Sequence, residues 1–149
     1  MTPYEIIDAI CDAINPILFF TTVALLIRAL LRKEYKKAMI GGGFLISGLL
    51  LVYGIMFLDN RMVVWESVGG DYSTHTAFAV AVLLSINLAI GKGKALLSIL
   101  AIYILLMLYQ QYHSLFDIVT TVIVVGLPLY FLQRMLSKIA TNSSKVAIS

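Results

Sequence analysis

The sequence predicts an all-α integral membrane protein, a polytopic bundle of about five transmembrane helices that forms a single domain over residues 1–149. Two observations predict this fold class. Of the 149 residues, 60% are hydrophobic and only 13% are charged, whereas soluble domains carry about 25% charged residues. The apolar residues also gather in long uncharged runs separated by short polar segments, as expected for spans of about 20 residues.

The first span is expected over residues 13–31, after a helix that begins near the N-terminus. Thr2-Pro3-Tyr4-Glu5 has the order of a capping box with proline at the first helical position, which favours a helix start. Three acidic residues in this first segment limit how deeply it lies, so we expect it to ride in the membrane interface. Pro16 is expected to kink the entry into the membrane.

Four further spans follow the first. Residues 38–58 form an uncharged run whose inner end carries three consecutive glycines, a composition that allows close helix approach. Residues 74–90 and 95–112 are expected to form the next two spans, joined by a short loop that holds two lysines. The fifth span is expected over 115–132, and residues 133–149, rich in Ser, Lys and Asn, are expected to form a mobile tail.

The basic residues predict the orientation of these spans. Cytoplasmic loops of membrane proteins carry the excess of Lys and Arg, which predicts an N-terminus outside and a cytoplasmic C-terminus in a multi-pass protein of the cell membrane. Both histidines then fall on the non-cytoplasmic face. The net charge of +3 therefore follows the membrane and does not predict nucleic acid as a partner. Ten of the eleven basic residues lie on the predicted cytoplasmic side: Arg28, Arg32, Lys33, Lys36, Lys37, Lys92, Lys94, Arg134, Lys138 and Lys145.

The histidines and the single cysteine limit the cofactors. Cys11 has no second cysteine with which to form a disulfide or a structural zinc site, so we expect no cofactor and no metal. An alternative is that the two histidines ligate haem or a metal together with Asp71 or Glu66. Haem ligation across a bundle requires facing histidines at similar depth, and the sequence has no further histidine as a third ligand.

The first candidate site stretch is Tyr112-His113-Ser114-Leu115-Phe116-Asp117. At helical spacing His113 and Asp117 are i and i+4, so we expect them on one helix face with the carboxylate about one turn deeper. A carboxylate in a span is costly and needs a partner, and we predict a hydrogen bond to His113, direct or through one water. The alternative is a structural pair that only locks the fifth span.

The second candidate stretch runs from Gly69 to Thr76 and contains His75 two residues after Ser73, the expected N-cap of the third span. A helix start offers unpaired N–H groups and the positive end of the helix dipole to an anion. Taken alone, His75 is more simply read as an exposed interfacial residue than as a site residue. Because the only two histidines lie at two helix starts on one face, we predict a phosphate site between them.

Together the two stretches resemble the second and third signature motifs of the type 2 phosphatidic acid phosphatase superfamily. The Gly70-Asp71 lead-in is more similar to the branch that contains the sphingomyelin and inositol phosphorylceramide synthases. The resemblance covers about Gly69 to Val125. It implies that His113 is the nucleophile that takes the phosphoryl group, oriented by Asp117, and that His75 is the general acid.

The resemblance further implies that Ser73 binds phosphate, and Arg61 and Asp71 are the remaining candidates for that role. Arg61 is the only cation on the predicted outer face, and a transferring phosphoryl group needs positive charge around its oxygens. The cation-bearing Ser-Arg of the third motif falls on Leu106 and Met107. The arginine of that motif is therefore missing here. This leaves a second interpretation open, a non-catalytic membrane scaffold that has lost the cations that would bind phosphate.

The sequence therefore predicts a lipid phosphatase or phosphotransferase that works through a phosphohistidine near the outer leaflet. The expected partners are a lipid phosphate substrate and membrane lipids, with homo-oligomerisation open. The alternative functions are the non-catalytic scaffold and a haem- or metal-binding membrane protein. Four aromatic residues near the outer boundary are read as an interfacial belt in preference to a substrate box: Trp65, Tyr72, Tyr109 and Tyr112.

Overall fold

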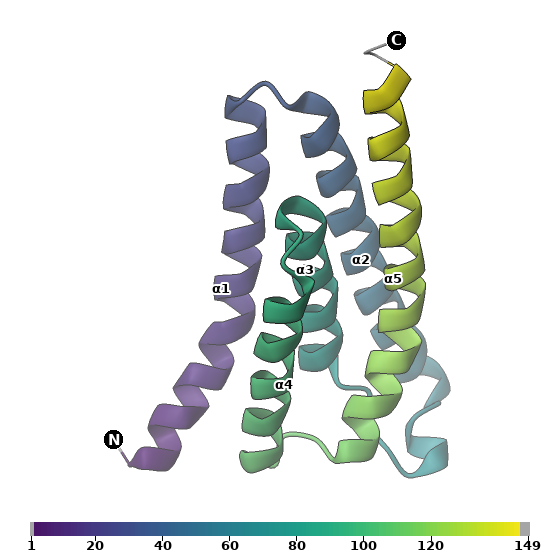
Figure 1. The fold of residues 1–149 in the computed structure, drawn as a ribbon. Helices are drawn as coiled ribbons and strands as arrows, with labels where there is room; N and C mark the ends of the chain where they lie inside the picture. Colours follow the sequence, from purple (N-terminus) through teal and green to yellow (C-terminus); the bar gives the residue numbers. More distant parts are fainter. Residues whose placement is uncertain (1, 147–149) are drawn as a thin grey trace.

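The computed structural model describes residues 2–146, and within that part five α-helices and one 3-10 turn make up all of the regular structure (Figure 1). The all-α prediction is thereby confirmed for the described residues. The helices run alternately up and down, so successive connections lie at opposite ends of the bundle. The elements are α1 (Pro3–Leu31), α2 (Tyr35–Met62), η1 (Glu66–Val68), α3 (Thr74–Ile90), α4 (Gly93–Tyr109) and α5 (Leu115–Val146).

Helix α3 is the centre of the bundle and contacts each of the other four helices. Its buried face is built from small residues, with Ala77, Ala79 and Ala81 completely enclosed. Small side chains let neighbouring helix backbones approach closely, which is how helices pack where lipid removes the hydrophobic driving force. The central position of α3 therefore follows from its composition.

Three helices are long and apolar enough to cross a membrane, which indicates a membrane protein. The candidate spans are Tyr4–Leu31, Tyr35–Met62 and Leu115–Ile139. Helices α3 and α4 have 17 residues each, or about 26 Å at 1.5 Å per residue, at the lower limit of spanning length. The five-span topology and its orientation stay predictions.

Helix α1 is continuous from its first residue to Leu31, so the interfacial segment and the first span form one helix. The expected capping box is present: the Thr2 hydroxyl accepts from the Glu5 N–H, and the Glu5 carboxylate accepts from the Thr2 N–H at 2.8 Å. Pro16 lies inside the helix, and the first half of α1 leans away from the rest (Figure 1), as a lost backbone hydrogen bond at proline allows.

Helix α5 does not end at Leu132, where the sequence suggested that a tail begins. It continues to Val146, while residues 147–149 of the expected tail lie outside the described part. Gln133, the first residue past the expected end, is buried, and its side chain donates to the Leu84 carbonyl at 2.7 Å. The Gln133 Oε1 also accepts from Asn87 Nδ2 at 3.4 Å. A polar residue that sequence composition assigns to a tail is thus part of the helix packing.

The two ends of the bundle differ in charge. One end, called the histidine end below, holds the N-terminus, the α2–α3 connection and the α4–α5 connection (Figure 1). The opposite end, called the basic end, holds the α1–α2 turn and the last turns of α5, and the α3–α4 turn faces the same way. Ten of the eleven Lys and Arg residues belong to the basic end. Seven of the eight acidic residues belong to the histidine end: Glu5, Asp8, Asp12, Asp59, Glu66, Asp71 and Asp117.

Candidate functional site

Ser73 is the N-cap of α3, as the sequence predicted. The Ser73 hydroxyl accepts from the Thr76 N–H at 3.3 Å and lies 2.8 Å from the Thr76 hydroxyl. The Ser73 N–H donates to the Thr121 hydroxyl at 3.2 Å. Ser73 is completely buried, so its hydroxyl is occupied by the helix cap and does not face an open site for phosphate.

The start of α5 matches the expected residue, but His113 is not part of the helix. The helix begins at Leu115, and Ser114 caps it: its N–H and hydroxyl donate to Asp117 Oδ2 at 2.8 and 2.7 Å, while its hydroxyl accepts from the Asp117 N–H at 3.2 Å. This is a reciprocal capping arrangement. His113 therefore lies in the turn before the helix, and the prediction that His113 and Asp117 share a helix face is wrong.

Asp117 connects the two candidate stretches. Its Oδ1 accepts from the Asp71 N–H at 2.7 Å, and its other oxygen is taken by Ser114. Asp117 is buried, and the described residues contain no direct hydrogen bond between it and His113. The direct form of the predicted hydrogen bond is therefore absent, because the carboxylate is used to join the loop before α3 to the first turn of α5.

His113 faces a different carboxylate, that of Asp71. The Nδ1 of His113 lies 3.5 Å from Asp71 Oδ2, and this nitrogen is buried without a hydrogen bond in the described part of the chain. Burial lowers the pKa of His113 below its usual value, the Asp71 and Asp117 carboxylates oppose that shift, and a charge on His75 would add to it. The net effect favours the neutral imidazole at neutral pH.

Asp71 therefore occupies the position that the sequence assigned to Asp117. Its exposed carboxylate faces an imidazole and would repel a phosphate anion, which argues against a direct phosphate contact by this residue. The sequence carried one sign of this arrangement, since Asp71 follows the Gly69-Gly70 turn. Turn geometry alone did not reveal which residue of α5 or its preceding loop would meet it.

His75 is exposed on the first turn of α3. Its Nδ1 lies 3.5 Å from the Tyr103 hydroxyl, and its carbonyl accepts from Asn15 Nδ2 at 3.2 Å. Sequence reasoning missed both partners, although a tyrosine in mid-span and an asparagine beside Pro16 were visible signals. His75 also lines a cavity of about 450 Å³ between α1, α2 and α3, whose other walls are largely aromatic: Phe19, Phe20, Tyr53 and Phe78.

Tyr112, the first residue of the His113 stretch, brings that stretch close to His75. Its ring centroid is 6.0 Å from that of His75, and its hydroxyl donates to the Asp8 carboxylate of α1. That hydrogen bond, with burial and the nearby acidic residues, raises the pKa of Tyr112. The structure thus brings His75, His113, Asp71 and Asp117 to one end of the bundle.

Arg61 does not join this group. Its guanidinium lies over the Phe57 ring of its own helix at 5.3 Å, and in residues 2–146 no ion pair links it to the acidic residues of the site. The contact is a cation–π interaction between neighbours one turn apart. The described site therefore contains two imidazoles and two carboxylates without a bound cation.

The expected aromatic belt is wrong for two of its four members. Trp65 and Tyr72 are buried and pack edge to face with ring centroids 5.0 Å apart. Trp65 Nε1 donates to the Thr120 hydroxyl at 2.9 Å, and the Tyr72 hydroxyl donates to the Val52 carbonyl at 3.1 Å. These polar tips find partners inside the bundle, which the sequence pattern could not reveal.

The comparisons with known proteins bear on the family resemblance. No protein-family model matches the chain, and no curated protein or solved structure matches it. The resemblance to the phosphatidic acid phosphatase superfamily therefore rests on the two short motifs. In the described part of the chain no group of three or more His, Cys, Asp or Glu residues gathers as a metal site, so the metal alternative gains no donor set.

Proposed function

We propose that this protein is a multi-pass membrane enzyme that transfers the phosphoryl group of a lipid phosphate, with its site on the non-cytoplasmic side. The observation that supports the proposal is the position of His113, whose Nδ1 faces the Asp71 carboxylate at 3.5 Å. A carboxylate on one ring nitrogen stabilises the imidazolium character that develops when the other nitrogen attacks. Asp71 takes the orienting role, and Asp117 positions Asp71.

The chemistry proceeds in two steps. In the first, Nε2 of neutral His113 forms a bond to phosphorus while the bond from phosphorus to the lipid oxygen breaks, and His75 gives that oxygen its proton. In the second, the oxygen of water or an alcohol forms a bond to phosphorus while the bond from phosphorus to His113 Nε2 breaks, and His75 takes the proton of that oxygen, which releases phosphate or a new phosphate ester. The lowered pKa of His113 supports this assignment, because only the neutral imidazole is nucleophilic.

The cavity beside His75 supports a lipid as the substrate. It lies between three helices, and its walls are largely aromatic, which suits the first carbons of an acyl or isoprenoid chain. A leaving oxygen attached to such a chain would emerge next to His75. The acceptor, water or an alcohol, is left open by this geometry.

The test is the capture of the phosphoenzyme. Purified protein incubated with radiolabelled phosphatidate and a chelator is expected to form an acid-labile phosphoprotein that His113→Ala abolishes. His75→Ala should slow its formation, and less so with a good leaving group. Asp71→Asn should lower turnover while Glu66→Gln, an exposed acidic residue at the same end, should not. Failure to consume any lipid phosphate would overturn the proposal.

A specific observation favours a second function, that of a non-catalytic membrane scaffold. Arg61, the one Lys or Arg residue of the histidine end in the described part of the chain, lies against Phe57, and Ser73 is fully buried in its cap. A scaffold would keep the Asp117 hydrogen bonds and need neither imidazole. The double variant His75→Gln, His113→Gln separates the two, because a scaffold would keep its stability and its cellular role whereas an enzyme would lose the latter.

A further inference from the structure

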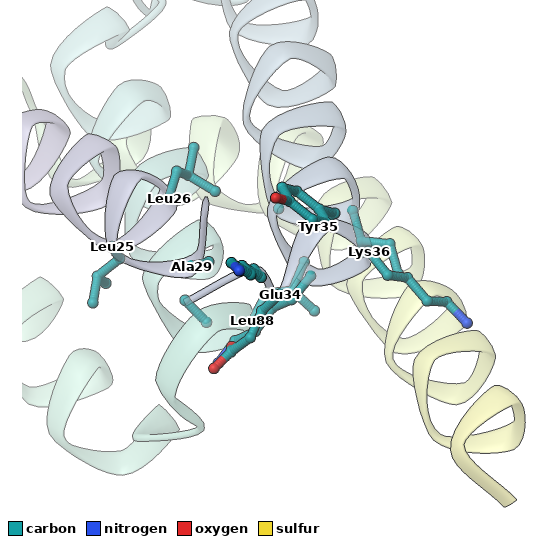
Figure 2. A pocket seen from close by; sticks show the side chains of 12 residues that line it. Leu25, Leu26, Ala29, Glu34, Tyr35, Lys36 and Leu88 are labelled. Carbon is teal, nitrogen blue, oxygen red and sulfur yellow. The ribbon is translucent and has the colours of Figure 1, made fainter. Parts of the chain in front are cut away.

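The largest cavity among those described lies at the basic end and belongs to neither histidine stretch. It has a volume of about 540 Å³ and is formed where the end of α1, the start of α2 and the end of α3 meet (Figure 2). Its inner wall is apolar, with Leu25, Leu26, Ala29 and Leu88 labelled in Figure 2. A second cavity of about 270 Å³ adjoins it and shares five of its lining residues.

The mouth of these cavities is strongly basic. The residues from both cavities that carry positive charge are Arg28, Arg32, Lys33, Lys36 and Lys37. A single acidic residue, Glu34, accompanies them and pairs with Lys37 at 3.5 Å. Figure 2 shows that Lys36 extends away from the apolar wall. Within the described residues, three unpaired cations, Arg28, Arg32 and Lys33, are left at the mouth beside the Lys37–Glu34 pair.

The turn between α1 and α2 adds donors to this mouth. Lys33 adopts a left-handed conformation with φ of 59°, and the Glu34 N–H bonds back to the Ala29 carbonyl at 2.9 Å, so the turn is only three residues long. Glu34 gives α2 no side-chain cap. The first N–H groups of α2 are therefore open beside the cationic side chains, where they favour an anion.

We propose that an anionic phospholipid binds here, with its headgroup phosphate among Arg28, Arg32, Lys33 and Lys37 and the start of an acyl chain in the apolar cavity. Basic pockets between transmembrane helices are a recognised form of lipid site. The apolar wall favours a phospholipid over free phosphate, because free phosphate would leave the apolar cavity unfilled. The positive charge at the mouth favours an anionic lipid over a zwitterionic lipid such as phosphatidylcholine.

The experiment measures lipid bound to the full chain in detergent by native mass spectrometry. Phosphatidylglycerol is expected to bind as one tight molecule, and phosphatidylcholine at least about fivefold more weakly, since each cation near the headgroup contributes about that factor. Lys37→Gln should lower the affinity for phosphatidylglycerol about fivefold. The matched control is Lys138→Gln, an exposed α5 lysine outside both cavities, which should change the affinity less than twofold.

A second pair of variants tests the apolar half. Gly41 lines the cavity, and a Cβ there would lie 2.8 Å from Leu26 Cδ2, whereas a Cβ on Gly42 would meet nothing within 4 Å. Gly41→Leu should fill the cavity and lower lipid affinity at least about fivefold, and Gly42→Leu should not. Millimolar inorganic phosphate should not displace the lipid. Equal affinity for both lipids, equal loss in both lysine variants, or displacement by phosphate would each overturn the proposal.

Discussion

The two ends of the bundle use their polar residues differently. At the histidine end, polar side chains reach across the sequence to distant backbone groups: Asp117 accepts from Asp71, and Tyr72 donates to Val52. At the basic end, the turns are closed by short-range backbone bonds, such as the Gly91 N–H to the Asn87 carbonyl at 2.8 Å. The basic residues of these turns are exposed.

This difference shows where polar residues are available for function. A buried polar group with a hydrogen bond is occupied, and removing it leaves its partner unsatisfied. By that criterion Ser73 and Asp117 are structural, whereas Nδ1 of His113 is buried without a hydrogen bond in the described residues and faces the Asp71 carboxylate at 3.5 Å. The basic cavity can bind an anion because its lining holds five Lys and Arg residues and one acidic residue, Glu34.

The largest expected effect concerns the orientation of the two ends. In a Cys11→Ser background, a membrane-impermeant thiol reagent applied from outside should label Glu66→Cys and not Lys92→Cys, because the excess of basic residues stays on the cytoplasmic side. Both positions are exposed, so access depends on the side of the membrane. The opposite labelling pattern would place the histidines in the cytoplasm.

The second prediction concerns Asp117, which we expect to be the most sensitive polar residue for stability. Asp117→Ala leaves the Asp71 N–H and the Ser114 N–H without their acceptor and should destabilise the protein by about 3 kcal/mol. Equilibrium unfolding in detergent measures this loss. Glu66→Gln at the same end serves as the control. If the two variants unfold alike, Asp117 does not join the two stretches.

The third prediction compares two glycines. A Cβ on Gly70 would lie 2.8 Å from both Asp117 Oδ1 and Phe116 Cε1, whereas one on Gly54 would meet nothing within 4 Å. Gly70→Ala should therefore cost about 2 kcal/mol, since the backbone must move away from a well-packed neighbour. Gly54→Ala, in the middle of α2, should stabilise by about 0.5 kcal/mol. A tolerated alanine at Gly70 would mean that the loop can shift freely.

The fourth prediction is the pH dependence of the histidine end. The pKa of His113 is lowered in the folded protein, so below about pH 6.5 the unfolded chain takes a proton that the folded chain refuses. Stability should be complete above that pH and fall as the pH drops below it. His113→Gln should flatten this acid limb in pH-dependent unfolding. An unchanged limb would show that other groups cause it.

Much of the fold could be predicted from the sequence, because hydrophobic runs and helix caps are local. The bounds of α3 match the expected 74–90, and the caps at Thr2 and Ser73 are present. The start of α5 at Leu115 also matches the expectation, but His113 lies before this helix, because Ser114 and Asp117 have capping-box spacing and cap it. The Asp71–His113 pair could not be predicted, since it depends on how two loops meet.

The fifth and smallest prediction concerns backbone strain in the turns of the two ends. Val63 ends α2 at the histidine end with φ of 48°, and Lys33 follows α1 at the basic end with φ of 59°. The left-handed region costs an L-residue about 1–2 kcal/mol, and more when the side chain is β-branched. Glycine adopts this region without that cost, but it loses more conformational entropy on folding, which costs about 0.5–1 kcal/mol. Val63→Gly should therefore stabilise by about 0.5–1 kcal/mol, and Lys33→Gly by less. Val63 is half exposed, so little packing is lost in the exchange. Equilibrium unfolding of both variants checks the order, and a destabilised Val63→Gly would mean that its side chain holds the turn before Trp65.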